Sequence, residues 1–304
     1  MNHLKSFSDI QRDDFIIAER MAYIDFRLNY TGRISRNDLG DTFGLAEASA
    51  TRVLRQYNTY RPSNMNYDRS EKVNVINKEE FTPLINIRAE EALEMLASGF
   101  NKNRLSNKSL IPYVRVGQTP NLLNCNHVAM ITRAMYEKKA LKCCYNSANS
   151  MNSTERVLVP LAILFDGRNW IFRAFERNES ISQKFKNFNF ARIASVKDIN
   201  ESQEAEQLAH ESLFQDIQWN TIVPVALEIH PDLTEKTRET VRNDFGIAEG
   251  EDELFLTERS ALVWLLLHQW NVEKGTELND SKGESPLYWF KLKNLEMLRQ
   301  YGAL

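Results

Sequence analysis

The sequence predicts a multidomain α+β protein made of three modules. Three observations predict it: apolar residues recur with helical spacing in the first third, short strand patterns fill the middle, and the last third contains both periods. With 304 residues and a hydrophobic content of 42%, the chain is long enough for two or three domains of roughly 100 to 200 residues each. We place a first domain at residues 1–98, a linker at 99–126, a second domain at 127–205 and a third at 206–304.

Two short helical patterns meet at Gly44, where a tight turn requires a positive φ. Leu39 and Phe43 lie one turn apart on the first pattern, and the buried stripe of the second recurs at i, i+3, i+4 and i+7: Ala50, Val53, Leu54 and Tyr57. The outward positions of the second helix carry hydroxyls, guanidinium groups and an amide, which suit base edges and phosphates. We therefore expect DNA contacts from Ser49, Thr51, Arg52, Arg55 and Gln56.

An ordinary surface helix hairpin would give a similar pattern, but two neighbouring segments favour a winged helix-turn-helix domain. Upstream, a third amphipathic stripe ends at Thr31 and Gly32 and consists of Ile17, Met21, Ile24 and Leu28. Downstream, residues 60–75 are turn-rich and then alternate, as in a β-hairpin wing, from which we expect further DNA contacts by Arg61, Asn64, Asn66 and Lys72. Ala46 stands where a capping Ser, Thr or Asp is expected, so the second helix has a weak N-cap.

The second module follows a polar linker with two prolines, which begins where a helical segment ends at Gly99. A short helix is expected at 128–136, and a turn at Asp166-Gly167. Strands are expected at 141–145, 157–165, 170–175 and 188–193. Closely spaced short strands joined by polar turns predict a small antiparallel β-barrel.

Formal charge is concentrated in this middle module, although the whole chain carries only -3. Residues 1–100 contain 13 basic and 15 acidic side chains, residues 101–197 contain 16 and 5, and residues 198–304 contain 9 and 21. Such a basic segment is typical of a domain that faces phosphates, although a solvated basic surface that offsets an acidic neighbour remains the alternative. Arg156 and Arg192 on neighbouring strands would suit an anion clamp, with Tyr145 and Trp170 available to stack on a base.

The third module mixes helices and strands, which predicts an α+β domain. After an acidic helical stretch at 201–214, the patterns indicate strands at 223–229, 253–257 and 286–292, helices at 234–245 and 260–270, and a helix at the C-terminal end. The helix at 260–270 is apolar over more than one stripe, so we expect this module to mediate dimerisation.

The sequence contains no recognisable catalytic or metal-binding motif, so we expect neither an enzyme nor a cofactor. One close pair, Cys125 and His127, cannot complete a four-ligand zinc shell. An enzyme such as a nuclease with an unrecognised site remains a third class of function. No run approaches the ~18 apolar residues of a membrane span and no signal peptide is visible, so we expect a cytoplasmic protein without membrane contact. We expect the three cysteines to be buried reduced thiols.

Residues 156–193 resemble the signature of WYL domains, in which a strand with R-x-x-x-P leads through a glycine turn to Trp-Tyr-Leu and a later strand ends in F-R-L-x-R-I. The matching positions are Arg156, Pro160, Gly167, Trp170, Ala174, Phe188, Arg192 and Ile193. Ile171 and Phe172 replace the Tyr and Leu of the name, and Asn189 replaces an arginine. These departures remove a hydroxyl and a guanidinium from the polar pocket of the family.

The order of the modules and the segment at residues 36–57 look most like the dimeric WYL regulators that control bacterial anti-phage defence islands, the BrxR and CapW type. The resemblance implies an Sm-like barrel in the WYL domain, a homodimer on an inverted-repeat DNA operator, and repression that responds to a nucleotide or single-stranded nucleic acid. The effector residues expected together on this basis are Tyr145, Arg156, Trp170, Arg173, Lys186 and Arg192. An RNA-binding or single-strand-binding module without a regulatory role is the alternative.

Overall fold

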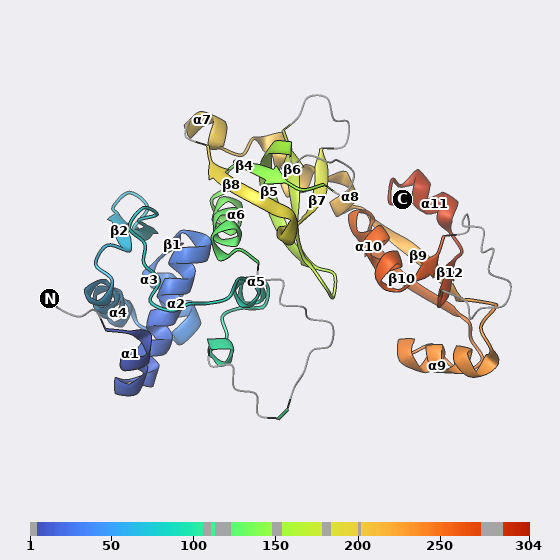
Figure 1. Ribbon diagram of the computed structural model, residues 1–304, viewed down its shortest axis with the longest axis horizontal. Coiled ribbons are helices and arrows are strands. Elements are labelled where there is room, and N and C mark those ends of the chain that lie inside the picture. Colours follow the sequence, from blue (N-terminus) through green and yellow to red (C-terminus); the bar gives the residue numbers. More distant parts are fainter. Residues whose placement is uncertain are drawn as a thin grey trace. The chain divides into compact units, whose positions relative to one another are not determined.

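The computed structural model describes residues 5–105, 111–112, 123–147, 154–177, 184–199, 202–274 and 288–304 (Figure 1). The chain divides into two compact units, Met1–Leu208 and Ala209–Leu304, and each is described by itself. The first unit contains the helical N-terminal domain and a five-stranded sheet, and the second contains a four-stranded sheet with helices. None of the helices in the described segments has the length and apolar character needed to cross a membrane.

The N-terminal domain begins with α1 (Phe7–Asp13) and α2 (Phe15–Thr31). The predicted stripe of α2 is confirmed, since Met21, Ile24 and Leu28 are buried. The helix ends at Gly32, which has a φ of 80°. A Cβ at this position would also lie 2.5 Å from Oε1 of Glu137, the end of a flexible side chain that can move away, so it is the positive φ that favours glycine here.

The helix-turn-helix consists of α3 (Arg36–Phe43) and α4 (Glu47–Tyr60), preceded by β1 (Arg33–Ile34). Gly44 has a φ of 65°, as the tight turn requires. The four residues of the predicted stripe on α4 are all buried. The N-cap position at Ala46 makes no side-chain hydrogen bond, which confirms the weak cap.

The wing is an antiparallel hairpin of β2 (Met65–Asp68) and β3 (Val73–Ile76), as predicted. With β1 it forms a three-stranded sheet in the order β1-β3-β2, which ties the wing to the end of α2. The chain continues through α5 (Ala89–Ser98) and a short 3-10 turn, η1 (Lys102–Leu105).

The second domain begins with α6 (Cys125–Glu137), three residues earlier than expected, because the Asn124 side chain accepts from the backbone N–H groups of Asn126 and His127 and caps the helix. Its sheet has the order β7-β6-β5-β4-β8, with every described pairing antiparallel. The strands are β4 (Leu141–Tyr145), β5 (Thr154–Phe165), β6 (Trp170–Glu176), β7 (Phe185–Asn189) and β8 (Ile193–Asp198). Irregularities in β4 and β5 bend this sheet, as a small barrel requires.

The strand expected at 188–193 was wrong. This stretch contains the end of β7, a 3-10 turn, η2 (Phe190–Arg192), and the start of β8. The Asn189 side chain accepts from the Ala191 N–H, and this local bond turns the chain between two strands. The cysteine expectation holds only for Cys143, because Cys125 and Cys144 are half-buried; all three thiols are free.

The acidic stretch expected as a helix at 201–214 is also different. Only α7 (Ser202–Ala205) is α-helical there, followed by the 3-10 turns η3 (Ala209–Glu211) and η4 (Leu213–Gln215). The Arg177 guanidinium donates to the backbone carbonyls of Glu204 and Glu206, and Glu206 forms a bridge with Lys139. These bonds take carbonyls that a continuing helix would use.

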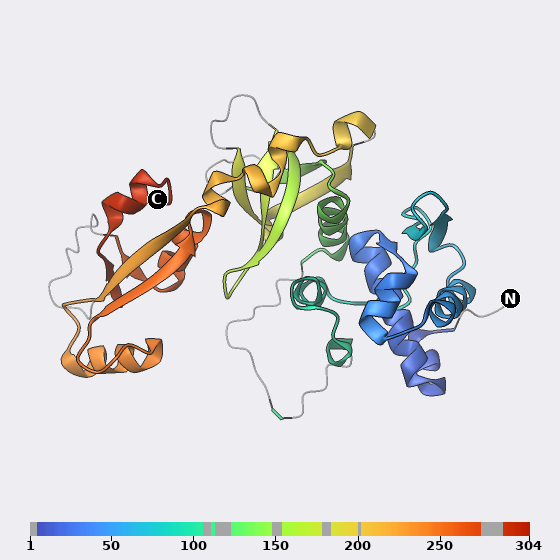
Figure 2. The same cartoon turned by 180° about the vertical axis from the view of Figure 1, so that it is seen from behind.

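The second unit is an α+β domain, as predicted. Its sheet has the order β10-β9-β12-β11, and α9 connects β9 to β10 at one end of the sheet (Figure 2). The elements are α8 (Ile217–Asn220), β9 (Ile222–Ile229), α9 (Glu235–Phe245), β10 (Glu253–Arg259), η5 (Ser260–Leu262), α10 (Val263–Gln269), β11 (Val272–Glu273), β12 (Phe290–Leu292) and α11 (Leu295–Gln300). The strand expected at 286–292 is confirmed only as β12, and residues 286–287 lie outside the described residues.

Candidate nucleic-acid interface and effector site

The outer face of α4 carries two arginines that are available to a ligand. Arg52 and Arg55 are exposed, and neither has an ion-pair partner in the described part of the chain. Thr51 and Gln56 are half-buried and partly engaged: the Thr51 hydroxyl donates to the Glu47 carbonyl at 2.9 Å, and the Gln56 amide donates to the Tyr60 hydroxyl at 3.2 Å. The arginines are therefore the main free donors of this helix.

A concave surface of about 700 Å³ lies between α4 and the wing. Three of the residues that line it, Arg36, Arg55 and Lys72, are cationic, and none is acidic. The full lining consists of Arg36, Thr51, Leu54, Arg55, Asn58, Pro62, Met65, Asn66, Tyr67, Lys72 and Asn74. Lys72 has a positive φ of 58° between the two strands of the wing, where its ammonium is exposed. This acid-free groove has the charge that a phosphate backbone requires.

Of the residues expected to contact DNA, one lies in the core and another is partly engaged by backbone carbonyls. Asn64 is buried, where its amide donates to the Tyr57 hydroxyl and to the Thr82 carbonyl. Arg61 is half-buried and donates to the Lys5 and Tyr60 carbonyls.

Sequence reasoning missed other residues of the groove. Arg36, Asn58 and Tyr67 all line it, and Tyr67 is 54% exposed on β2. A large aromatic side chain exposed on a predicted wing was the available signal for Tyr67. Arg36 forms an ion pair with Glu47, which joins the first turns of α3 and α4.

A buried polar cluster holds the inner face of α4 against α2. The Asp25 carboxylate accepts from the Tyr57 hydroxyl at 2.6 Å and from the Leu84 N–H at 3.0 Å. Burial raises the pKa of Asp25 to about 6 and also raises the pKa of the Tyr57 hydroxyl above its usual value. Because Tyr57 belongs to α4 and Asp25 to α2, this cluster sets the position of the helix that carries Arg52 and Arg55.

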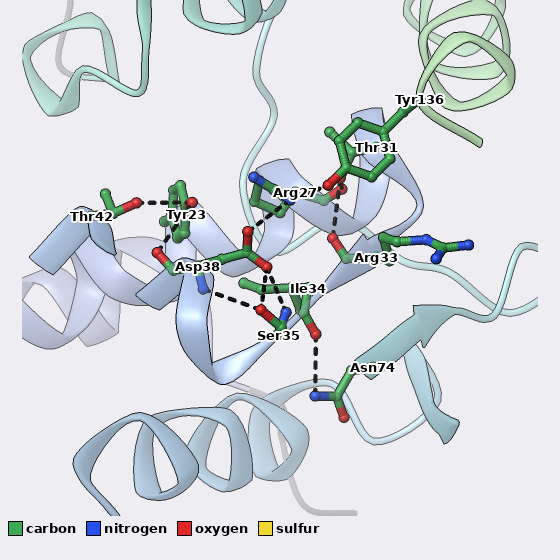
Figure 3. Close-up of polar contacts among 10 residues, drawn as sticks. All are labelled: Tyr23, Arg27, Thr31, Arg33, Ile34, Ser35, Asp38, Thr42, Asn74 and Tyr136. Atoms are coloured by element: carbon green, nitrogen blue, oxygen red, sulfur yellow. Dashed lines mark hydrogen bonds and ion pairs between the residues drawn. The ribbon is translucent and has the colours of Figure 1, made fainter. Parts of the chain in front are cut away.

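A second polar network links the start of α3 to α6 (Figure 3). Asp38 closes a capping box with Ser35 and forms an ion pair with Arg27 at 3.0 Å. The Arg27 guanidinium also donates to the Tyr136 hydroxyl of α6 at 3.1 Å. One arginine of α2 therefore contacts both the helix-turn-helix and the helix of the second domain.

Two of the expected effector residues converge on a buried acid that sequence reasoning did not select. Arg156 on β5 donates to Glu176 at 3.0 Å, and Lys186 on β7 donates to the same carboxylate at 2.9 Å. The Glu176 side chain is only 3% exposed. The Arg156 guanidinium also lies 5.7 Å from the centre of the Tyr145 ring. The sequence signal that could have identified Glu176 is its position directly after the aromatic strand expected at 170–175, as an acid in a strongly basic segment.

The other expected effector residues lie apart from this carboxylate or are buried. Trp170 begins β6 and packs on Phe165, and six residues of strand, about 20 Å, separate it from Glu176. Arg173 is 2% exposed and donates to the Asn187 amide oxygen at 3.2 Å. Arg192 is exposed in the 3-10 turn after β7.

The second unit exposes several large apolar side chains. They include Phe214, Ile217, Ile222, Phe255 and Trp264, and Phe214 is 85% exposed. Within the helix that was expected to be apolar on more than one face, Val263 and Leu267 are buried in the core while Trp264 faces outward. Exposed apolar side chains in such number are typical of a surface that contacts another protein chain.

Three family models match the chain, in the order of its domains. They are the winged helix-turn-helix domain of the BrxR transcriptional regulator over residues 17–98, the WYL domain over 126–198 and the C-terminal dimerization domain of the BrxR transcriptional regulator over 222–297. The chain is 28% identical to the DNA-binding transcriptional repressor CapW of Pseudomonas aeruginosa over 259 residues, which cover 84% of this chain and 83% of that protein. It is 29% identical to CapW of Stenotrophomonas maltophilia with the same coverage, and 28% identical to CapW of Escherichia coli over 83% of this chain and 82% of that protein. With three matching domains in one order, the chain belongs to the WYL-domain transcriptional regulators of the BrxR and CapW type.

Proposed function

We propose that this protein is a homodimeric transcriptional repressor that binds an inverted-repeat operator in the cytoplasm. The observation that carries the proposal is the acid-free groove between α4 and the wing, with Arg52 and Arg55 exposed on the helix that would enter the major groove of DNA. The relatives named as DNA-binding repressors support the same conclusion. We expect the operator to lie in front of the protein's own gene and of a phage-defence operon.

The two parts of the interface have different roles in this proposal. Arg52 and Arg55 on α4 present forked donors that pair with guanine O6 and N7, so they would read sequence. Lys72 and Asn66 on the wing would hold the DNA backbone and contribute affinity without sequence preference. A dimer formed through the C-terminal domain would place two copies of α4 about 34–36 Å apart, or a multiple of this, on successive turns of DNA.

The WYL domain would bind an anionic effector, such as a nucleotide or single-stranded nucleic acid, at Arg156 and Lys186. Glu176 holds both cations, so the effector must replace a carboxylate that already satisfies them. A ligand with several phosphates does this more readily than a monoanion, because it offers more than one charge-assisted hydrogen bond. Such a ligand alters repression only if it binds the DNA-competent and incompetent dimers with different affinities.

The test is a fluorescence anisotropy titration of the full protein with DNA from upstream of its own gene, at fixed salt. Replacement of Arg52 or Arg55 by Ala should weaken operator binding by about 1–3 kcal/mol and relax the base preference at one position. Arg168→Ala removes an exposed arginine from the β5–β6 turn and is the matched control, which should bind as the parent does. Equal binding by parent and a double Arg52, Arg55 variant would refute the assignment of α4. Preferential binding of single-stranded RNA, without sequence preference, would favour the alternative of an RNA-binding module.

A further inference from the structure

A second cavity in the first unit lies outside both sites described above. It has a volume of about 430 Å³ and is lined by α2, by the segment between Ile76 and Ile87, and by α6. Two cations, Lys78 and Arg133, lie in its wall, and no aspartate or glutamate does. We call it the junction cavity, because its walls come from both the winged helix-turn-helix and the WYL domain.

Arg133 is the cation of this cavity that makes no direct ion pair among the described residues, although the carboxylates of Asp198 and Glu137 attract its charge from a greater distance. Its guanidinium donates to the Asn29 carbonyl at 2.8 Å. Burial lowers the pKa of Arg133, because the charged form is partly removed from water. Lys78, by contrast, pairs with Asp198 of β8 at 2.7 Å. A partly buried and unpaired guanidinium is unfavourable, and a bound anion would remove this cost.

The remaining wall is suited to the rest of an organic ligand. Three asparagines, Asn29, Asn86 and Asn126, contribute amide groups or backbone carbonyls, and Tyr30 and Met130 contribute apolar surface. The volume lies in the lower part of the usual range of ligand sites, roughly 300–1,000 Å³. A ligand of this size with one charged end and a flat, polar-edged body matches these walls.

We propose that the junction cavity binds a small organic phosphate of the size of a nucleoside monophosphate, with the phosphate at Arg133. Arg156 and Glu176 do not line this cavity, so the site is separate from the proposed effector site on the WYL sheet. The bound ligand would touch α2 and α6 together, and so would favour one placement of the DNA-binding domain on the WYL domain. This effect on DNA binding rests on the proposed function, whereas the binding itself does not.

The test is isothermal titration calorimetry of the full-length protein with AMP, GMP, CMP and UMP, and with adenosine as a ligand that lacks phosphate. We expect at least one monophosphate to bind, adenosine to bind at least tenfold more weakly, and the affinity to fall as salt rises. Arg133→Met keeps the length of the side chain without its charge and should weaken binding at least tenfold. Asn126→Asp should do the same by adding a negative charge to the wall. An acid in the first turn of α6 also favours the helix, so this variant keeps the fold intact.

Arg168→Met, which removes an exposed guanidinium of the same domain outside the wall of the junction cavity, is the matched control and should bind the monophosphate as the parent does. Arg156→Met is measured as well, because it shows whether the monophosphate binds at the WYL sheet instead. Three results would overturn the proposal: no binding of any of the four monophosphates by the parent, equal binding by the parent and both cavity variants, or loss of binding in Arg156→Met alone. Operator affinity without ligand is measured separately on the same proteins. A parent that binds its operator but no monophosphate refutes the junction site alone, and a parent that binds a monophosphate but no DNA refutes the proposed function alone.

Discussion

Asp25 should make the stability of the DNA-binding domain depend on pH. This residue of α2 has an almost fully buried side chain that contacts Tyr57 of α4 and the backbone at Leu84. Burial raises its pKa from 3.8 to about 6. The folded domain therefore holds the proton more tightly than the unfolded chain does. The stability that this group contributes is complete below about pH 4 and is lost as the pH rises through about 6.

The size of the effect follows from the two pKa values. A difference of about two pH units corresponds to a fall of about 3 kcal/mol in the free energy of unfolding between about pH 4 and 6. Asp25→Asn removes the titrating proton and should abolish this slope. The variant should also be less stable than the parent at low pH, by about 1–3 kcal/mol, because the amide NH₂ that replaces Oδ2 cannot accept from the Ile85 N–H group, whereas the Leu84 N–H keeps the amide oxygen as its acceptor.

Hydrogen exchange of the full-length protein measures the pH dependence of local stability, in peptides that cover residues 81–87 and α4. The measurement runs from pH 4.5 to 7.5 and is corrected for the intrinsic exchange rate. Protection in the parent should decrease across this range, and protection in Asp25→Asn should be flat. Asp41→Asn, at an exposed position of the same domain, is the control and should follow the parent. A parent without a slope, or a slope that persists in Asp25→Asn, would refute the reasoning.

Three further variants test the turn, the domain contact and the dimer. Gly44→Ala should lower stability by about 1 kcal/mol, because φ is 65° while nothing lies within 4 Å of the added Cβ; an unchanged melting temperature would contradict this. Tyr136→Phe deletes the hydroxyl that accepts from Arg27 and should change operator affinity by about threefold to tenfold in anisotropy titrations, and identical curves would show that this contact does not position α3. Phe255→Glu places a charge on a side chain that is 68% exposed, and sedimentation velocity at micromolar concentration should detect monomers; a variant that stays dimeric would remove Phe255 from the interface.

Periodicity predicted α2, α3, α4 and the wing of the N-terminal domain because these helices each bury one stripe and the turns carry their own signals, whereas it did not predict α1 or β1. Leu39 and Ala50 are buried as expected, and Gly44 adopts the left-handed conformation. The same reasoning failed at residues 188–193, where the alternating pattern continues across a turn that the Asn189 side chain caps. Local capping bonds of this kind leave no trace in hydrophobic spacing.

The candidate sites were less predictable than the fold, because they depend on partners far apart in the sequence. Asn64 resembles a wing residue by position, yet the Thr82 carbonyl 18 residues away holds it in the core. Glu176 is one acid in a basic segment, and its role becomes visible only when β5 and β7 bring Arg156 and Lys186 to it. Sequence alone gives the residue types of such a cluster but not their pairing.

Little energy is needed for a change in the WYL domain to alter DNA binding. A tenfold change in operator affinity corresponds to about 1.4 kcal/mol, and a hydrogen bond to a charged group contributes about 1.5–3 kcal/mol, or less when it is exposed. Polar contacts between the described residues of the two domains include Arg27 with Tyr136, Arg133 with the Asn29 carbonyl, Lys78 with Asp198, and the Cys125 thiol with the Ile87 carbonyl. Because α6 packs against α2 as well as against β5 and β8, a shift of this one helix would alter these contacts directly. The gain or loss of one or two of them is therefore enough for regulation, without a longer chain of coupled residues.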